Sequence, residues 1–330
     1  MNLSRISAHA LTLCFLSSAS TFALAQATIK MVFGAPLTTL HLPIIVAEQE
    51  GYFKAAGLTV EKIFLAGDAN SLRAVASGDA DAASTGTLTL ISAAAAGSDI
   101  RGIFSYQPIA DYNIIAKDPA ATLKTLGNKS FASSGPLDMT TEIPKMVMRK
   151  NGVDPATVKF IQIGGHSARL LAVSAGKVDA SMVNTYTATQ GAKAGNVKVL
   201  GSVAQDVPNI GYSIVVTSKK TLANADKRKN LETLTQAIMQ GARFIMKNPD
   251  RAAEMMKVAS PDMDLEILKA TFKLLNADMV WGVNGGIERP VIEFTAQLAK
   301  DIGTAPRVLS YSDLIDATLV DTVTKRIGKF

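Results

Sequence analysis

The sequence predicts an α/β protein built from two successive β-α series and a helical C-terminal part. From Thr28 to about Val216, short apolar runs alternate with stretches of helical character, which is typical of parallel sheets covered by helices. After Lys219 the apolar residues recur at three- and four-residue spacing, so this part is expected to be almost entirely helical. With a signal segment removed, about 305 residues remain, enough for two units with separate cores.

Ten short apolar runs set between helical stretches are expected to form strands. They are Ile29–Phe33, Leu58–Leu65, Ala80–Ala83, Ile100–Phe104, Tyr112–Ala116, Ser130–Ala132, Val158–Ile161, Val178–Met182, Val197–Leu200 and Tyr212–Val216. The helices expected in the C-terminal part are Arg228–Lys247, Pro249–Val258, Leu265–Leu275 and Ile287–Lys300.

One short pattern occurs twice in the chain. The residues Ala-Val-x-x-Gly-x-x-Asp-Ala at positions 74–82 recur at positions 172–180, an offset of 98. Each copy is expected to be a helix capped by a left-handed glycine, Gly78 or Gly176, and followed by a short buried strand. The repeat predicts one supersecondary unit used twice; a chance likeness is the alternative, because turn chemistry offers few solutions.

The first 25 residues have the three parts of a secretory signal. Arg5 gives a basic start, Ile6–Leu24 is largely apolar, and Ala23-Leu24-Ala25 is a small-x-small cleavage site. We expect the mature chain to begin at Gln26 and to lie in the periplasm. A signal anchor is the alternative, but serine and threonine residues between positions 17 and 21 interrupt the run before it could span a membrane.

Cysteine content and charge exclude several classes of protein. Cys14 is the only cysteine and lies in the predicted signal, so the mature chain has no thiol for a disulfide, a nucleophile or a metal site. The formal net charge is +6 before Arg5 is lost, and the basic residues are scattered, most densely over 219–229. This favours a solvated surface over a nucleic-acid patch.

Structural needs alone can explain the residues of the segment Pro43–Leu58, PIIVAEQEGYFKAAGL. Pro43 suits the first turn of a helix, Gly51 suits its end, and Gly57 permits the turn into the next strand. Its spacing P-x-x-x-A-x-x-x-G-x-F-x-x-x-G-L also resembles the periplasmic binding proteins of nitrate/sulfonate/taurine-type ABC transporters, whose fold is shared with thiamine-pyrimidine synthases. ASGDADAA at 76–83 and AGKVDASMV at 175–183 resemble two further landmarks of that family.

The resemblance implies a two-lobed periplasmic-binding-protein (venus flytrap) fold with two crossovers and a helical C-terminal tail packed on lobe one. Lobe one would comprise residues 26–114 and 213–330, and lobe two residues 115–212. The crossovers would lie near Tyr112–Ala116 and Tyr212–Val216. The implied role is that of a monomeric extracytoplasmic protein that delivers a small molecule to the permease of an ABC importer, without a cofactor, metal or nucleic acid. A ligand in the cleft would stabilise the closed form.

Candidate ligand contacts follow from a rule for open α/β sheets. Ligands lie beyond the carboxyl ends of the strands, where helix N-termini expose unpaired N–H groups. The rule selects the loops Gly34–His41, Ala66–Ser71, Ser84–Thr87, Ser133–Thr140, Gly164–Ser167 and Asn184–Tyr186. Each polar residue in them could simply cap a helix. The ligand-binding residues expected are Thr38, Thr39, His41, Asp68, Ser84, Thr85, Ser134, His166, Asn184, Tyr186 and Trp281.

Four of these residues have more specific expected roles. His41 and His166, the only histidines of the mature chain, could face one another. They lack further ligands at metal spacing, so a hydrogen bond to the ligand or a helix cap is expected instead of a metal site. Tyr186 and Trp281 could cover the carbon portion of a ligand, with core packing an equal possibility for Trp281.

The expected ligand is a small organic anion, such as a sulfonate or carboxylate, held on helix N-termini instead of in an arginine cage. A neutral ring is the alternative. An enzyme like the thiamine-pyrimidine synthases is a second reading, but those use a histidine with a cysteine-rich segment, and no Ser–His–Asp, HExxH or Walker pattern is present. A solute-binding partner of a membrane sensor fits the sequence as well as a transport protein does.

Overall fold

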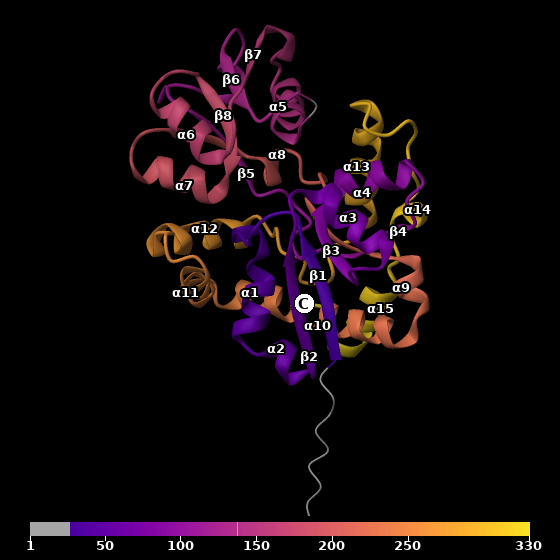
Figure 1. Cartoon of the computed structure of the whole chain (residues 1–330). Helices are drawn as coiled ribbons and strands as arrows, with labels where there is room; N and C mark the ends of the chain where they lie inside the picture. The colour runs from indigo at the N-terminus through magenta and orange to yellow at the C-terminus, as the bar shows by residue number, and fades with distance from the viewer. Residues whose placement is uncertain (1–26, 137) are drawn as a thin grey trace, which may run out of the picture.

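The computed structural model describes residues 27–136 and 138–330, so the predicted signal segment, including Cys14, lies outside the described residues. The chain forms two five-stranded sheets, each with its own helices (Figure 1). We call the part built on the first sheet lobe one and the part built on the second sheet lobe two. The sequence prediction of a two-lobed α/β fold with a helical C-terminal part is confirmed.

The first sheet has the strand order β2-β1-β3-β10-β4. The first three of these strands run parallel to one another, whereas β10 is antiparallel to both β3 and β4. The strands are β1 (Ala27–Phe33), β2 (Leu58–Phe64), β3 (Ala82–Gly86), β4 (Ile100–Phe104) and β10 (Ser213–Ser218).

The second sheet has the order β7-β6-β8-β5-β9 and repeats this plan. Its strands β7, β6 and β8 are parallel, and β5 is antiparallel to both β8 and β9. The strands are β5 (Tyr112–Ala116), β6 (Ser130–Ser133), β7 (Lys159–Gln162), β8 (Ala180–Asn184) and β9 (Lys198–Ser202).

All ten expected strands are present, but the sheets are mixed where the sequence suggested parallel sheets. The reason is that β5 and β10 each enter their sheet from the other lobe, against the direction of the local strands. The segments that lead into them run side by side. Tyr212 N–H donates to the carbonyl of Pro108 at 2.8 Å, and Ile109 pairs with Gly211 in an antiparallel bridge. The chain thus crosses between the lobes just before β5 and just before β10.

Fifteen α-helices cover the sheets, and within the part of the chain that the structure describes none is long and apolar enough to cross a membrane. The helices before β10 are α1 (Leu42–Gln49), α2 (Tyr52–Ala55), α3 (Asp68–Ser77), α4 (Thr87–Ala95), α5 (Met139–Lys150), α6 (His166–Ser174), α7 (Thr185–Lys193) and α8 (Val203–Asp206). The helices of the tail are α9 (Lys219–Ala223), α10 (Ala225–Lys247), α11 (Pro249–Ala259), α12 (Leu265–Ala277), α13 (Arg289–Asp301), α14 (Tyr311–Leu314) and α15 (Thr318–Ile327).

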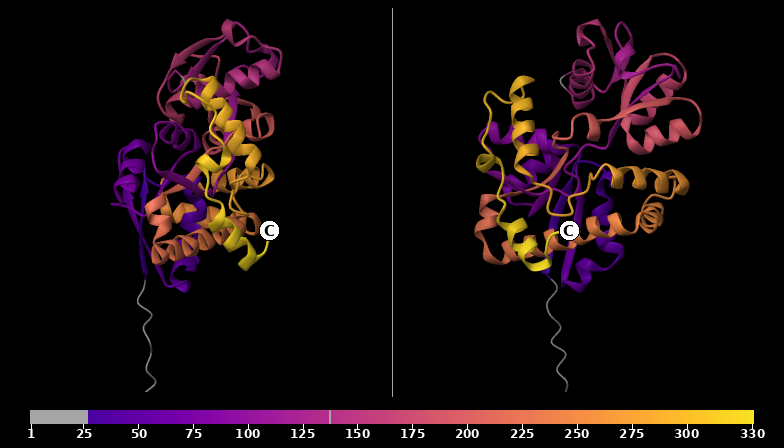
Figure 2. Two further views of the ribbon diagram at one scale, coloured as in Figure 1. Left: turned by 90° about the vertical axis from the view of Figure 1, so that its right-hand side faces the viewer. Right: turned by 180° about the vertical axis from the view of Figure 1, so that it is seen from behind.

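The tail packs mainly on lobe one, as the rear view shows (Figure 2). Helix α10 lies along α1, and α13 lies against α4. Helix α12 is an exception because it also contacts α7 of lobe two. At its N-terminus the backbone N–H of Asp264 donates to the hydroxyl of Tyr186 at 3.0 Å. At its C-terminus Asp278 accepts hydrogen bonds from Ser202 and Gln205, each at 2.7 Å.

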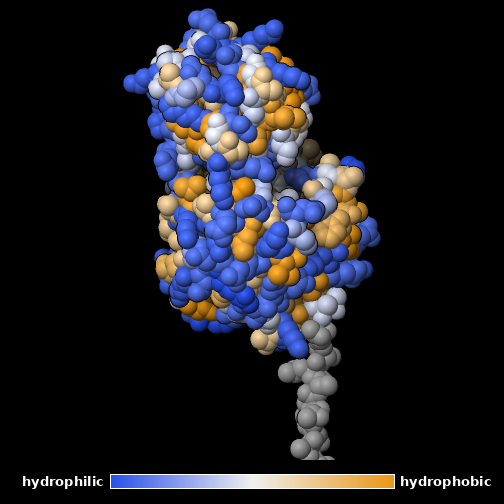
Figure 3. All heavy atoms as spheres, turned by 90° about the vertical axis from the view of Figure 1, so that its left-hand side faces the viewer, coloured by the Kyte–Doolittle hydropathy of each residue, from blue (hydrophilic) through white to orange (hydrophobic). Residues whose placement is uncertain are grey.

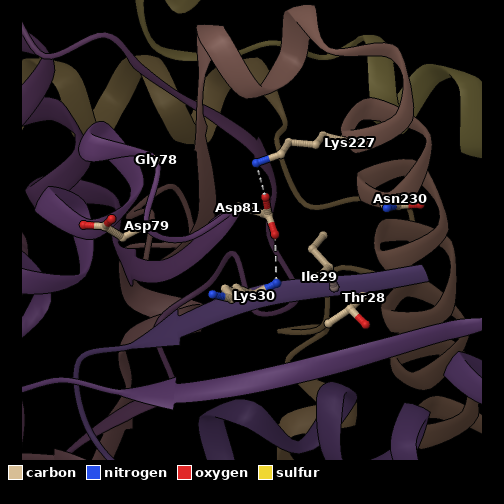
Figure 4. A pocket seen from close by; sticks show the side chains of 8 residues that line it. All are labelled: Thr28, Ile29, Lys30, Gly78, Asp79, Asp81, Lys227 and Asn230. Atoms are coloured by element: carbon tan, nitrogen blue, oxygen red, sulfur yellow. Dashed lines mark hydrogen bonds and ion pairs between the residues drawn. The ribbon is translucent and has the colours of Figure 1, made fainter. Parts of the chain in front are cut away.

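The repeated sequence pattern has the same structural task in both lobes. Gly78 and Gly176 have positive φ values of 90° and 69° at the ends of α3 and α6, as expected of left-handed caps. The aspartate position of the pattern, three residues after each glycine, is occupied by Asp81 and Asp179. Each of these carboxylates accepts a hydrogen bond from a backbone N–H of the neighbouring strand. Asp81 bonds Lys30 at 2.9 Å and also pairs with Lys227, and Asp179 bonds Ser130 at 2.8 Å (Figure 4). The repeated pattern therefore holds neighbouring strands together and does not contribute to ligand binding.

Candidate ligand-binding site

A cavity of about 210 Å³ lies at the carboxyl ends of the parallel strands of lobe one, where the surface is hollowed between the lobes (Figure 3). The segment after β1, the first residue of α3 and the end of β3 supply most of its walls, and Tyr212 with the start of β10 supplies the rest. This is the position at which open α/β sheets bind ligands. The lining residues are Gly34, Ala35, Leu40, His41, Asp68, Ser84, Thr85, Gly86, Tyr212 and Ser213.

Asp68, the first residue of α3, lines this cavity with its carboxylate. Its Oδ2 atom accepts hydrogen bonds from the hydroxyl of Thr85 at 2.9 Å and from the backbone N–H of Gly86 at 2.8 Å. Gly34 makes room for the carboxylate, since a Cβ atom there would lie 2.5 Å from Asp68 Oδ1. The two loops after β1 and β2 are thus adapted to each other at this carboxylate.

His41 is 7% exposed and lines the same cavity. Its Nδ1 atom accepts a hydrogen bond from the backbone N–H of Thr38 at 3.1 Å, so in the neutral ring the proton is on Nε2. Burial lowers the pKa of His41 to about 4, which keeps the ring neutral near pH 7. The ring packs edge-on against Phe33 at 5.4 Å and beside Tyr106 at 5.9 Å. His41 can therefore offer a ligand one N–H donor without a charge.

The neighbouring hydroxyls belong to a buried network. Ser84 is hydrogen-bonded to the hydroxyl of Tyr106, and burial raises the pKa of Tyr106, so this phenol stays protonated. Thr85 is committed to Asp68, as described above. Thr39 is buried, and Thr38 is exposed and contacts His41 through both its backbone N–H and its hydroxyl. Thr38 thus orients the histidine from outside the cavity.

His166 at the start of α6 is the counterpart of His41 in lobe two. Its Nδ1 atom accepts hydrogen bonds from the backbone N–H of Asn184 at 3.1 Å and from Arg169 Nη2 at 3.0 Å. The proton of the neutral ring is therefore again on Nε2. Burial, followed by the charge of Arg169, lowers the pKa of His166 to about 4, against a smaller opposing effect of Asp138. Both histidines are thus fixed in the same tautomer.

Arg169 is 2% exposed and lies behind His166. Its Nε atom donates to the carbonyl of Met182 at 3.1 Å, and Nη1 donates to the carbonyl of Gly164. Burial lowers the pKa of Arg169, but a guanidinium stays protonated at any ordinary pH. A buried positive charge therefore supports the loop at the N-terminus of α6.

The remaining lobe-two candidates cap helices. Asp138 accepts hydrogen bonds from the hydroxyl of Ser134 at 2.6 Å and from the backbone N–H of Thr140 at 2.7 Å, at the start of α5. Burial alone would raise the pKa of Asp138, but these bonds and the charge of Arg169 lower it. Asn184 accepts from the backbone N–H of Thr187 at 3.0 Å and so caps α7.

Two tyrosines that the sequence analysis did not select connect the two halves. The rings of Tyr112 and Tyr212 meet edge-on at 5.3 Å, their hydroxyls lie 3.4 Å apart, and Tyr112 packs on His166 at 5.7 Å. Tyr212 also lines the lobe-one cavity. The sequence signal for them was their position as first residues of two runs near the expected crossovers. Through these contacts the two rings link His166 to the lobe-one cavity.

A buried polar pair, Gln107 and Asp111, lies in the first crossing segment, directly before Tyr112. Gln107 is fully buried and Asp111 is 3% exposed, and the side-chain amide of Gln107 and Oδ1 of Asp111 find no hydrogen-bond partner among the described residues. Burial raises the pKa of Asp111 to about 7, although nearby Gln107 and Tyr212 counteract it. This carboxyl group therefore changes charge near neutral pH.

The two aromatic residues chosen from the sequence do not line the cavity. Trp281 is 3% exposed and packs on Phe272, and its indole N–H donates to Asn276 at 2.8 Å, so it belongs to the core between α10, α11 and α12. Tyr186 holds the start of α12, as described above. Core packing, one of the two readings for Trp281, is thus the one that the structure supports.

The helix N-termini are less free than the sequence suggested. The carboxylates of Asp68 and Asp138 already accept hydrogen bonds from backbone N–H groups at the starts of α4 and α5. The side chain of Asn184 does the same at the start of α7. The start of α6, with Gly165 as its N-cap, carries no side-chain cap. Across residues 27–136 and 138–330, no group of three or more His, Cys, Asp or Glu side chains that could hold a metal ion is present.

Two other cavities fit a ligand site less well. One of about 260 Å³ lies at the opposite edge of the first sheet, beside Asp81, whose oxygens are already paired with Lys30 and Lys227 (Figure 4). Another of about 270 Å³ lies at the carboxyl ends of β6 and β7, where Lys145 is paired with Glu142 at 2.8 Å. Of these three cavities, the lobe-one cavity is the one lined by both a carboxylate and an imidazole.

The two sheets, the paired crossing segments and the polar cavity define a two-lobed α/β protein with the periplasmic-binding-protein fold. The family described as NMT1/THI5 like matches residues 38–252, and the chain belongs to this family. The resemblance found in the sequence is thereby confirmed. A search of curated proteins finds no match.

Solved structures confirm the fold at low sequence identity. The periplasmic aliphatic sulphonate binding protein SsuA from Escherichia coli has a TM-score of 0.68 and 15% identity, over 88% of this chain and 92% of that chain. The periplasmic nitrate-binding protein NrtA from Synechocystis PCC 6803 has a TM-score of 0.70 and 14% identity, over 92% and 89% of the chains. A mutant of DSZB in complex with biphenyl-2-sulfinic acid has a TM-score of 0.67 and 11% identity, over 91% and 99% of the chains.

Proposed function

We propose that this chain is an extracytoplasmic solute-binding protein that captures a small organic solute between its lobes and delivers it to the permease of an ABC importer. The observation that carries the proposal is the polar cavity beside two antiparallel crossing segments. The structural neighbours support it, because two of them are described as binding a sulphonate and nitrate in the periplasm. A periplasmic location of the mature, monomeric chain belongs to the same proposal.

Closure of the two lobes is the expected mechanism. We assign residues 27–111 and 213–330 to lobe one and residues 112–212 to lobe two, because β5 starts at Tyr112 and belongs to the second sheet, and we place the hinge in the crossing segments before β5 and β10. A solute bound to both lobes stabilises the closed form by its extra contacts. The radius of gyration from small-angle scattering should fall when a solute saturates the protein, and an unchanged radius would contradict a hinge.

The acidic group of an organic anion is expected to face lobe two. The N-terminus of α6 lacks a side-chain cap, and His166 Nε2–H and the charge of Arg169 lie beside it. A thermal-shift screen of sulfonates, nitrate, aromatic acids, pyrimidines and flavins tests the binding role. A solute at 100 times its Kd should add about 2.7 kcal/mol to the free energy of unfolding. A screen without any shift would count against the proposal.

The fold similarity to DSZB, whose structure contains biphenyl-2-sulfinic acid, makes an enzyme the alternative to be tested. We propose binding without turnover, because both histidines have their Nδ1 atoms occupied and pKa values of about 4, which suits neutral donors better than proton acceptors near pH 7. Incubation with the tightest solute should return it chemically unchanged. Stoichiometric or catalytic conversion would favour the enzyme.

A further inference from the structure

Two side chains of opposite charge have no ionic partner among the described residues: Asp68, which lines the lobe-one cavity, and Arg169, which is buried behind His166 in lobe two. Asp68 on lobe one and Arg169 on lobe two make no ion pair within 4.0 Å to any residue that the structure describes. Buried or half-buried charges in proteins are normally paired, because removing a charge from water is costly. Each of these two charges therefore has capacity for a partner that arrives with the ligand.

On lobe one, the free capacity lies at Asp68 Oδ1. The hydrogen bonds from Thr85, Gly86 and Thr89 all go to Oδ2, and Oδ1 receives none from the described residues. No lysine or arginine is among the residues that line the cavity. A carboxylate in such a cavity repels an acidic group and attracts a cationic N–H donor.

On lobe two, Arg169 acts through the groups in front of it. Its three hydrogen bonds go to the carbonyls of Gly164 and Met182 and to His166 Nδ1, all of them neutral acceptors. Donation to Nδ1 polarises the imidazole and strengthens Nε2–H as a donor. The uncapped N-terminus of α6 adds a partial positive charge at the same loop. An acidic group is favoured here.

Asp138 is the one carboxylate that competes for Arg169. It lies close enough for each charge to affect the pKa of the other, but it is exposed, and its Oδ1 atom already accepts from Ser134 and from Thr140. Solvent screens an exposed carboxylate far more than a buried guanidinium. The net field on the α6 side of the cleft is therefore positive.

We propose that the solute is a small zwitterion, with a cationic nitrogen on Asp68 in lobe one and an acidic group at the Gly164–His166 loop in lobe two. Asp68 is then the residue that selects for the nitrogen, and Arg169 is a positioning residue that acts through His166. Tyr112 and Tyr212, which connect the two sites, support the carbon portion between the charged ends. The inference rests on the solute-binding function proposed above and narrows its ligand class.

Two matched triplets of probes test the proposal by titration calorimetry. One comprises β-alanine, its amine-free counterpart butanoate and its acid-free counterpart propylamine. The other comprises para-(aminomethyl)benzoate, para-ethylbenzoate and para-methylbenzylamine. In at least one triplet the zwitterion should bind at least about tenfold more tightly than both counterparts. Failure of both zwitterions to bind, or equal binding of the zwitterion and its amine-free acid in every triplet that binds, would overturn the proposal.

Two matched variants assign the preference to one carboxylate. Asp68→Asn should bring a zwitterion and its amine-free acid to within about twofold of each other, whereas Asp138→Asn should leave the preference intact. The same melting temperature as the parent protein verifies that each variant is folded. Loss of the preference in Asp138→Asn alone would move the nitrogen site to lobe two and overturn the assignment.

The outcome also separates this proposal from the function on which it rests. If amine-free acids bind as tightly as the zwitterions, the solute-binding role stands and the zwitterion is excluded. If the probes and the whole thermal-shift panel fail to bind, both proposals fall.

Discussion

The two lobes use one framework for two different tasks. Each has three parallel strands joined by an antiparallel strand that arrives from the other lobe. Each repeats a glycine cap followed by a strand-binding aspartate, and each has a histidine whose Nδ1 atom accepts a backbone N–H. These recurring features are structural: the glycine ends a helix, the aspartate holds a neighbouring strand, and the backbone N–H determines the tautomer of the histidine.

The lobes differ in the charge that lies behind each histidine. Lobe one combines His41 with a half-buried carboxylate, Asp68, and an open cavity. Lobe two combines His166 with a buried guanidinium, Arg169, and an uncapped helix start. A duplicated framework can therefore present opposite electrostatic surfaces to one cleft, and the following predictions test that difference.

The largest effect is expected from removing the charge in lobe two. Arg169→Met should lower the free energy of unfolding by about 3 kcal/mol, because the carbonyls of Gly164 and Met182 and the Nδ1 atom of His166 lose a charged donor. Urea unfolding measures this. Asp68→Asn is the matched change in lobe one and should cost less than about 1 kcal/mol, since an amide oxygen can still accept from Gly86. Equal costs would mean that the two charges have the same structural role.

Lowering the pH should destabilise both lobes, because it favours protonation of His41 and His166, which the folded protein keeps neutral. The folded pKa of about 4 lies below the ordinary 6.5 for His41 and His166, so the unfolded chain binds more protons between these values. The free energy of unfolding should therefore fall as the pH falls from about 6.5 to about 4, by up to about 3 kcal/mol for each histidine. His41→Asn and His166→Asn should each flatten the curve in this window, and a curve that keeps its slope in both would contradict the assigned burial.

Asp111 should give the free energy of unfolding the opposite dependence on pH. Its pKa is raised from 3.8 to about 7, so the folded protein holds this proton more tightly and loses stability as the pH rises from about 4 to about 7. Asp111→Asn should therefore stabilise the protein most at pH 8 and not at all at pH 3. Thermal unfolding at the two pH values measures the difference, and an equal effect at both would show that the carboxyl group is not perturbed.

A smaller effect is expected from a methyl group placed beside Asp68. In Gly34→Ala the new Cβ would lie 2.5 Å from Asp68 Oδ1 and 2.9 Å from the backbone nitrogen of Asp68, so the start of α3 has to move with its carboxylate. Affinity for the tightest zwitterion probe should fall by about tenfold. Gly127→Ala is the matched control in lobe two, because it lies outside both binding loops and a Cβ there makes only ordinary contacts, the nearest at 3.6 Å, so its affinity should change less than about twofold. An equal loss of affinity in both variants would mean that Asp68 does not bind the ligand.

The framework could be predicted from the sequence because it depends on local patterns. Apolar runs indicated all ten strands to within three residues at each end, and glycine positions indicated where α3 and α6 end. The direction of β5 and β10 could not be predicted from composition. It is set by the route of the chain between lobes, which only the family resemblance suggested.

The site could be predicted only as a set of loops. The rule on strand ends located Asp68, His41 and His166, because their place after a strand is a local feature. It did not find Tyr112 and Tyr212, which read as ordinary strand residues until the two crossing segments are seen side by side. Trp281 and Tyr186 were chosen as aromatic residues in loops, with core packing an equal possibility for Trp281, and the long-range packing of the tail places both in contacts between helices.

The smallest expected effect concerns Tyr186, for which the two possible roles predict different magnitudes. As the structure shows, its hydroxyl accepts from the backbone N–H of Asp264 and so joins lobe two to α12 of the tail. Tyr186→Phe removes this one hydrogen bond at a half-exposed position, which should cost about 0.5–1 kcal/mol of unfolding free energy. Affinity for the tightest zwitterion probe should change less than about threefold, because only the balance between open and closed forms is affected.

A matched change at the other end of α12 strengthens this test. Ser202→Ala removes the hydrogen bond to Asp278 at 2.7 Å, and Ser202 does not line the lobe-one cavity. If α12 is a contact between lobes, the two variants should shift affinity in the same direction and by similar amounts. If the ring of Tyr186 instead covers the ligand, Tyr186→Ala should weaken binding by tenfold or more, about 1.4 kcal/mol, whereas Tyr186→Phe, which keeps the ring, and Ser202→Ala should have little effect. The ratio of the losses in Tyr186→Ala and Ser202→Ala, measured by calorimetry, therefore decides whether lobe two contacts the solute through α7 or only through α6.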